Sequence, residues 1–133
     1  MLEKKKIKEL ANYWLINSKA KLKTMQGLYK IKRYADCLYY GHMVLEMILK
    51  ANTVKKTKNQ APRTHNLLWL AELTKLKLSK EELEIIAETS TFNMDARYPD
   101  EKQVFYKKCT KAYADKFYKP IISLYKKLCQ SVN

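Results

Sequence analysis

Residues 28–51 read LYKIKRYADCLYYGHMVLEMILKA, and this stretch decides the fold. Its apolar side chains recur at steps of three and four residues along two separate lines, which is the period of an α-helix with two apolar faces. A helix of this kind is normally enclosed by other helices, so the pattern predicts the central helix of a bundle. The first line comprises Leu28, Ile31, Ala35, Leu38, His42, Leu45 and Leu49, and the second comprises Tyr34, Cys37, Gly41, Val44, Ile48 and Ala51.

Helical periodicity continues on both sides of this stretch. Two glycines and three prolines supply too little turn chemistry for a strand-rich domain of 133 residues. We expect breaks at Gly27 and in a basic loop at 52–62. The composition and the periodicity predict an all-α, up-and-down bundle of about five helices, formed by residues 1–133 as a single domain. The four further helices are expected at about residues 7–25, 66–76, 79–92 and 101–130.

Local signals mark where two of these helices begin. Residues 79–82 have the S-x-x-E spacing of a capping box, which opens the fourth helix. Pro99 disfavours helical geometry at Tyr98, and Asp100 then stands where the N-cap of the last helix is expected. Inside that last helix, Pro120 is expected to cause a kink or a division.

The chain carries 27 basic and 13 acidic residues, a formal net charge of +14. Such a charge attracts phosphate-bearing partners, although lysine-rich helices also produce it without a functional reason. Cys37, Cys109 and Cys129 show no C-x-x-C spacing, which indicates reduced thiols rather than disulfides or metal ligands. The sequence has no apolar segment typical of a signal peptide or a membrane span. We therefore expect a cytoplasmic protein without a membrane anchor.

The stretch FNMDARYPD at 92–100 holds one of only three arginines. Arg97 precedes a predicted helix N-terminus, where backbone N–H groups favour an anion, and its planar guanidinium suits a phosphate. Alternatively, it forms an ion pair with Asp95, Asp100 or a nearby glutamate and holds the turn rigid. The residues alone leave both roles open.

His42 and Glu46 lie one turn apart on the central helix. We interpret them either as a buried, hydrogen-bonded pair or as polar contacts for a ligand in a groove of the bundle. Bundle proteins with di-iron centres need paired Glu-x-x-His motifs and further carboxylates, and this chain has only two histidines. We therefore expect no metal site.

The second histidine, His65, stands at the start of the short third helix. Thr64 or Asn66 can cap that helix through its side-chain oxygen. In the alternative interpretation, His65 joins Arg63 and Lys50 in a phosphate-facing cluster at one end of the bundle.

Three stretches together resemble the signature of HEPN domains, the higher eukaryotes and prokaryotes nucleotide-binding family. HMVLEMILKA at 42–51 is similar to the family's Gln/His-x-x-x-Glu-x-x-Leu-Lys-Ala helix. PRTHNLLWL at 62–70 is similar to its Pro-x-Thr-His-x-Leu-x-x-Leu element, and 97–100 matches its Arg-Tyr-Pro-Asp signature. The resemblance covers about residues 10–128.

The resemblance implies a bundle that forms a two-fold dimer and binds a nucleotide or nucleic-acid phosphate. It also implies a partner, a minimal nucleotidyltransferase, in a toxin–antitoxin or stress-type system. Some members are RNases built on an R-x4-6-H motif, but no arginine here is followed by a histidine at that spacing. We therefore expect a binding protein without catalytic residues or cofactors, with ATP or GTP as candidate ligands. A metal-independent RNase toxin and a non-enzymatic dimeric scaffold are the alternatives.

The resemblance also assigns roles to individual residues. Arg97 is expected to contact phosphate, Tyr98 to pack or stack beside it, and Pro99 and Asp100 to form the turn and cap. Lys50, Arg63 and His65 are further candidates for phosphate contacts. For the homodimer, we expect the central helix and the last helix to supply the two-fold surface, because apolar lines on two sides of one helix need covering.

Overall fold

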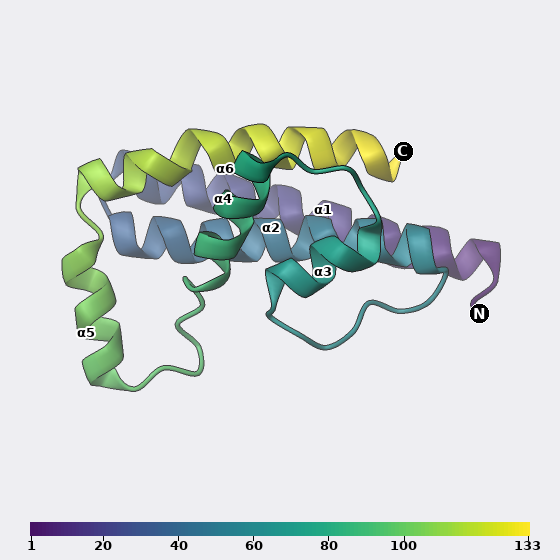
Figure 1. The fold of residues 1–133 in the computed structure, drawn as a ribbon, viewed down its shortest axis with the longest axis horizontal. Coiled ribbons are helices and arrows are strands. Elements are labelled where there is room, and N and C mark those ends of the chain that lie inside the picture. Colours follow the sequence, from purple (N-terminus) through teal and green to yellow (C-terminus); the bar gives the residue numbers. More distant parts are fainter.

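Figure 1 shows the fold in a computed structural model that describes residues 1–133. Six helices and no strands make up the chain, which confirms the all-α bundle. The three longest helices, α1, α2 and α6, run alongside one another, while α3 and α4 pack on α2 and α5 stands off one end (Figure 1). The helices are α1 (Lys4–Lys30), α2 (Tyr34–Thr57), α3 (Leu67–Thr74), α4 (Lys80–Ser90), α5 (Pro99–Lys108) and α6 (Lys111–Val132).

The central position predicted for the second helix is confirmed. More than half of the residues in α2 are buried, and α2 contacts all five other helices. Gly41 allows a close approach to α6, because a Cβ atom at this position would lie 2.9 Å from Cδ1 of Ile121. Both apolar lines of α2 are thus covered within the chain itself.

The break between the first two helices lies later than expected. α1 continues through Gly27 to Lys30, and the turn that follows holds Lys32 in the left-handed region, at φ 63°. The expected break at Gly27 is therefore wrong. A glycine inside a helix costs only about 1 kcal/mol relative to alanine, and the packing of a long helix can offset that cost.

The basic loop is also shorter than expected, because α2 extends through residues 52–57. Two polar residues in this extension, Asn52 and Thr53, are buried and find partners inside the bundle. Asn52 donates from Nδ2 to the carbonyl oxygens of Ile48, at 3.0 Å, and of Leu128, at 2.9 Å. The polar composition of this segment predicted a loop, but tertiary hydrogen bonds keep it helical.

The predicted last helix is divided at Cys109 and Thr110, which raises the number of helices from five to six. Thr110 caps α6, since its side chain accepts a hydrogen bond from the backbone N–H of Tyr113 at 3.2 Å. Pro120 lies inside α6 and does not divide it, so of the two expected outcomes, a kink or a division, the division does not occur. The hydroxyl cap, rather than the proline, decides where the helix begins.

Two helix starts test the capping signals directly. The capping box of α4 is confirmed, because Ser79 accepts from the backbone of Glu82 at 3.0 Å and Glu82 accepts from Ser79 at 2.8 Å. α5 begins at Pro99 with Tyr98 at the N-cap position, so Asp100 lies in the first turn and is not the cap.

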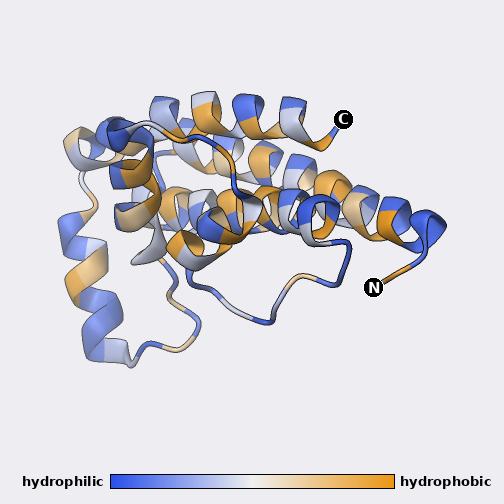
Figure 2. Cartoon of the chain, turned by 45° about the vertical axis from the view of Figure 1, so that its right-hand side comes forward, coloured by the Kyte–Doolittle hydropathy of each residue, from blue (hydrophilic) through white to orange (hydrophobic).

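The hydropathy pattern agrees with this packing. In Figure 2, hydrophobic and hydrophilic residues alternate along α1 and α6, as expected for helices that cover a core on one side. α5 is mostly hydrophilic in the same view. No helix combines the length and the apolar character that crossing a bilayer requires.

Candidate functional site

One face of α2 holds the polar residues that organise the candidate site. Tyr39, His42, Glu46 and Lys50 follow one another at steps of three and four residues, so they form a single line along the helix. Each contacts a different part of the chain. Tyr39 contacts the side chain of Asp95, and His42 contacts the backbone oxygen of Thr89. Glu46 contacts the side chain of His65, and Lys50 contacts the ring of Trp14. This line therefore fixes the segment before α3 and the segment after α4 on α2.

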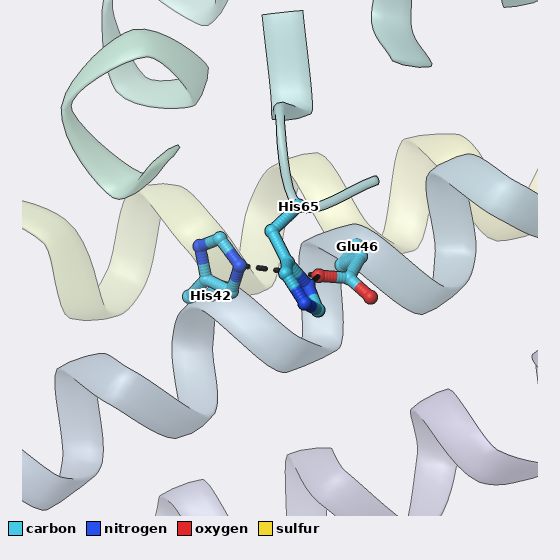
Figure 3. A group of neighbouring side chains, drawn as sticks. All are labelled: His42, Glu46 and His65. Atoms are coloured by element: carbon cyan, nitrogen blue, oxygen red, sulfur yellow. Dashed lines mark hydrogen bonds and ion pairs between the residues drawn. The ribbon is translucent and has the colours of Figure 1, made fainter. Parts of the chain in front are cut away.

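Glu46 is the centre of a buried polar cluster. Its Oε1 lies 2.7 Å from Nδ1 of His65 and 3.2 Å from Nε2 of His42, and its Oε2 accepts from Nζ of Lys50 at 3.0 Å. Figure 3 shows both imidazole rings directed at the carboxylate, His42 from the same helix and His65 from the loop before α3. Burial acts to raise the pKa of Glu46, but its polar contacts with His42, His65 and Lys50 outweigh it and lower the pKa to about 2.

His42 and Glu46 form the buried pair that was one of the two interpretations of the sequence. Lys50, Arg63 and His65 do not gather into a phosphate-facing cluster. Lys50 is buried, with its ammonium group 5.0 Å from the ring centroid of Trp14, and both Lys50 and His65 bond to Glu46. Arg63 is exposed and forms no ion pair. Asn66 caps α3, since it accepts from the backbone N–H of Trp69 at 3.1 Å.

The Arg97 turn forms a separate, exposed polar site. Its Nη1 donates to Oε2 of Glu101 at 3.1 Å, and its Nε donates to the backbone oxygen of Asn93 at 3.4 Å. The side chains of Arg97 and Glu101 are each 42% exposed, and the neighbouring Tyr98 is 74% exposed. The partner of Arg97 is thus a nearby glutamate, and neither Asp95 nor Asp100.

A shallow pocket of about 340 Å³ lies between this turn and α5. Its charged residues are Arg97, Glu101 and Lys108. An exposed ion pair such as the one between Arg97 and Glu101 contributes about 0–1 kcal/mol, whereas two hydrogen bonds from one guanidinium to a phosphate form a stronger, charge-assisted contact. The pair therefore holds the arginine without preventing it from binding an anion.

The family model of the HEPN domain matches residues 11–131. The chain belongs to the HEPN domain family. The solved structure of TT1696 from Thermus thermophilus is similar to this HEPN domain, with a TM-score of 0.75 and 18% sequence identity over 91% of this chain and 97% of that one. At this identity the similarity shows the shared fold alone. Comparison with curated proteins gave no significant match.

The fold of this HEPN domain brings the three signature stretches together. The 42–51 stretch lies in α2, where Glu46 receives His65 of the 62–70 stretch. One turn before that stretch, Tyr39 donates a hydrogen bond to Asp95 of the Arg97 turn. The 62–70 stretch and the turn that leads into the 97–100 stretch thus contact neighbouring points on α2, which carries the third stretch. HEPN domains often have roles that involve nucleotides or RNA, and they often form dimers.

Trp14 and Thr89 also belong to the cluster around α2, and sequence reasoning did not find either role. The helical spacing of Trp14 in the sequence is typical of a core residue and did not indicate its contact with Lys50. Thr89 contacts His42 through its backbone oxygen, so the type of its side chain could not indicate the contact. The pairing of Glu46 with Lys50 could have been predicted from the sequence, because opposite charges four residues apart on a helix lie side by side.

Proposed function

We propose that this HEPN domain binds the phosphate of a nucleotide or nucleic acid through Arg97 and serves a partner protein, without catalysis of its own. The supporting observation is the half-exposed guanidinium of Arg97, whose only charged partner is the equally exposed Glu101. Exposed Tyr98 lies beside it and offers a ring on which a base can stack. Arg63 is a peripheral candidate, while Lys50 and His65 would act by fixing the loops on α2.

We further propose a minimal nucleotidyltransferase as the partner, as the HEPN resemblance implies. The charge of the chain supports a nucleic-acid or nucleotide ligand in such a pair, because a net charge of +14 attracts phosphates over long distances. RNase chemistry is not favoured by a specific contact, because His42 is buried and its Nδ1 contacts the backbone oxygen of Thr89.

We expect Arg97→Ala to weaken binding of ATP, GTP or a short RNA by roughly ten- to a hundredfold, with helix content unchanged. One charge-assisted contact contributes about 1.5–3 kcal/mol, which corresponds to that change in affinity. Fluorescence anisotropy with a labelled oligonucleotide and calorimetry with the mononucleotides measure it. Arg33→Ala is the matched control, because it removes the same charge from another exposed position. If the folded Arg97→Ala protein bound these ligands as tightly as the wild type, the role of Arg97 would be structural.

Two further variants separate the arginine from its surroundings. Glu101→Gln removes the competing carboxylate and should tighten phosphate binding, whereas a purely bracing role predicts unchanged affinity. Replacing Lys55, Lys56 and Lys58 with glutamate should reduce the salt dependence of oligonucleotide binding. Each lost phosphate contact lowers the slope of log affinity against log salt concentration by about one unit. The replacement should hardly affect a mononucleotide. RNA cleavage in EDTA that depends on Arg97 would instead identify an RNase.

For the homodimer, we propose a surface other than the expected one on α2 and α6. Most of both apolar lines of α2 is covered inside the chain. An apolar groove of about 780 Å³ between α3 and α4 exposes Leu68, Trp69 and Leu83, each by 41–43%. Buried tryptophans often dominate the binding energy of interfaces. We therefore infer that two copies meet at this groove.

We expect the wild-type protein to have twice the chain mass of 15.8 kDa at micromolar concentration. Trp69→Ala should weaken the dimer by at least about thirtyfold, or 2 kcal/mol, because an interface hot spot is lost. Size-exclusion chromatography with light scattering measures both. Tyr13→Ala, at an exposed aromatic residue of α1, is the control and should remain dimeric. A wild-type monomer would exclude the dimer, and an unaffected Trp69→Ala dimer would exclude this groove.

A further inference from the structure

We propose that His42, Glu46 and His65 bind a divalent transition-metal ion such as Zn²⁺. One ligand atom from each of the three residues lies within 4.8 Å of the other two. His42 and Glu46 come from α2 and His65 comes from the loop before α3, so the ion would join two segments of the bundle (Figure 3). This proposal is independent of phosphate binding at Arg97.

The hydrogen bond on the far side of the His42 ring leaves Nε2 as the nitrogen available to a metal ion. Nδ1 lies 3.0 Å from the backbone oxygen of Thr89, and a carbonyl oxygen can only accept, so Nδ1 carries the hydrogen. In a neutral imidazole, Nε2 then presents a lone pair. That lone pair faces Oε1 of Glu46, another acceptor, at 3.2 Å. A metal ion bound to both atoms would use the lone pair of Nε2 and the charge of Oε1 at once.

The arrangement around His42 is the one that metal-binding histidines adopt. Such histidines usually donate the remaining ring N–H to a carbonyl or carboxylate, which sets the tautomer and the orientation of the ring. Thr89 supplies that carbonyl for His42. Lys50 performs the corresponding role for Glu46, because it holds Oε2 and leaves Oε1 directed at the two histidines.

The two distances to Glu46 can be compared with those around a small ion. Zinc binds nitrogen and oxygen at about 2.0–2.2 Å, so neighbouring ligands in a tetrahedral site are about 3.3 Å apart. The 3.2 Å between His42 and Glu46 fits without adjustment, and the 2.7 Å between His65 and Glu46 has to open by about half an ångström. The side chain of His65 is 62% exposed, so it has room to move and water can reach a fourth coordination position.

The ligand set and its charge decide the class of ion. With neutral imidazoles, the charges of Glu46 and Lys50 cancel, so an incoming dication meets no net negative charge. Mg²⁺ and Ca²⁺ depend on several oxygen ligands and have only one carboxylate oxygen here. Imidazole suits Zn²⁺, Ni²⁺ and Co²⁺, so two of the three ligands favour this class of ion.

Titration of untagged, chelator-treated protein with Co²⁺ and Zn²⁺ tests the site. We expect one ion per chain, and a cobalt spectrum without the intense near-ultraviolet band of thiolate ligands. His65→Ala should weaken binding at least about tenfold, because the loss of a ligand exceeds the effect of losing a supporting contact. Its exposure makes it the variant least able to disturb the fold, which circular dichroism checks. Zn²⁺ should also raise the Tm of the wild type and not that of His65→Ala.

Cys129→Ser serves as the matched control, since Cys129 is the only cysteine that is not buried. Its cobalt affinity should equal that of the wild type. Absence of a stoichiometric ion, or equal affinity in folded His65→Ala, would overturn the proposal. Affinity lost in Cys129→Ser would place the bound metal at a thiol and would equally overturn it.

Discussion

Replacing Glu46 with glutamine is expected to lower the free energy of unfolding by about 3–5 kcal/mol, because one partner of a buried ion pair is removed while the other charge stays buried. The ammonium group of Lys50 would be left beside Trp14 without its carboxylate, and His42 and His65 would lose the acceptor that both contact. Urea unfolding in metal-free buffer, followed by circular dichroism, measures the change.

A matched variant and a double variant show whether the buried charge is the cause. Glu101→Gln removes a carboxylate from an exposed pair of the same spacing and should cost less than about 1 kcal/mol. Adding Lys50→Met to Glu46→Gln should recover part of the lost stability, because both charges are then absent. A loss below about 1 kcal/mol in Glu46→Gln alone would show that the cluster is accessible to water and does not hold the loops.

Truncation of Phe92 to alanine should cost about 3–5 kcal/mol through the cavity that it leaves. Phe92 is 1% exposed, and its ring centroid lies 5.6 Å from that of Phe105, 6.2 Å from Tyr113 and 5.2 Å from Phe117. It thereby attaches the start of the Arg97 turn to α5 and α6.

The consequence of Phe92→Ala should reach the proposed ligand site as well. Once the anchor is lost, the Arg97 turn has fewer buried contacts and should show faster amide exchange at residues 93–97 than in the wild type. Tyr98→Ala, at a side chain that is 74% exposed, is the control and should change stability by no more than about 0.5 kcal/mol. Stability of Phe92→Ala close to that of this control would mean that the aromatic cluster does not support the turn.

The local parts of the fold could be predicted well. The two apolar lines of residues 28–51 identified the central helix, and the capping box of Ser79 and Glu82 and the cap at Asn66 were found at the expected positions. These features depend on side chains no more than a few residues apart, so the helical period is enough to relate them. Errors occurred where a local preference was weak, as at Gly27, or where a competing cap was overlooked, as at Thr110.

The sequence by itself determined the helical bundle, the family signature and the pairs of side chains one turn apart on α2. Only the tertiary structure decided what those pairs contact. His65 lies 19 residues from Glu46, Thr89 lies 47 from His42, and Asp95 lies 56 from Tyr39. The physical reason is that helical spacing relates neighbours along one element, whereas contacts between loops and helices depend on the path of the whole chain. His65, which the sequence placed at the start of a helix, therefore contacts the carboxylate of Glu46 on another helix.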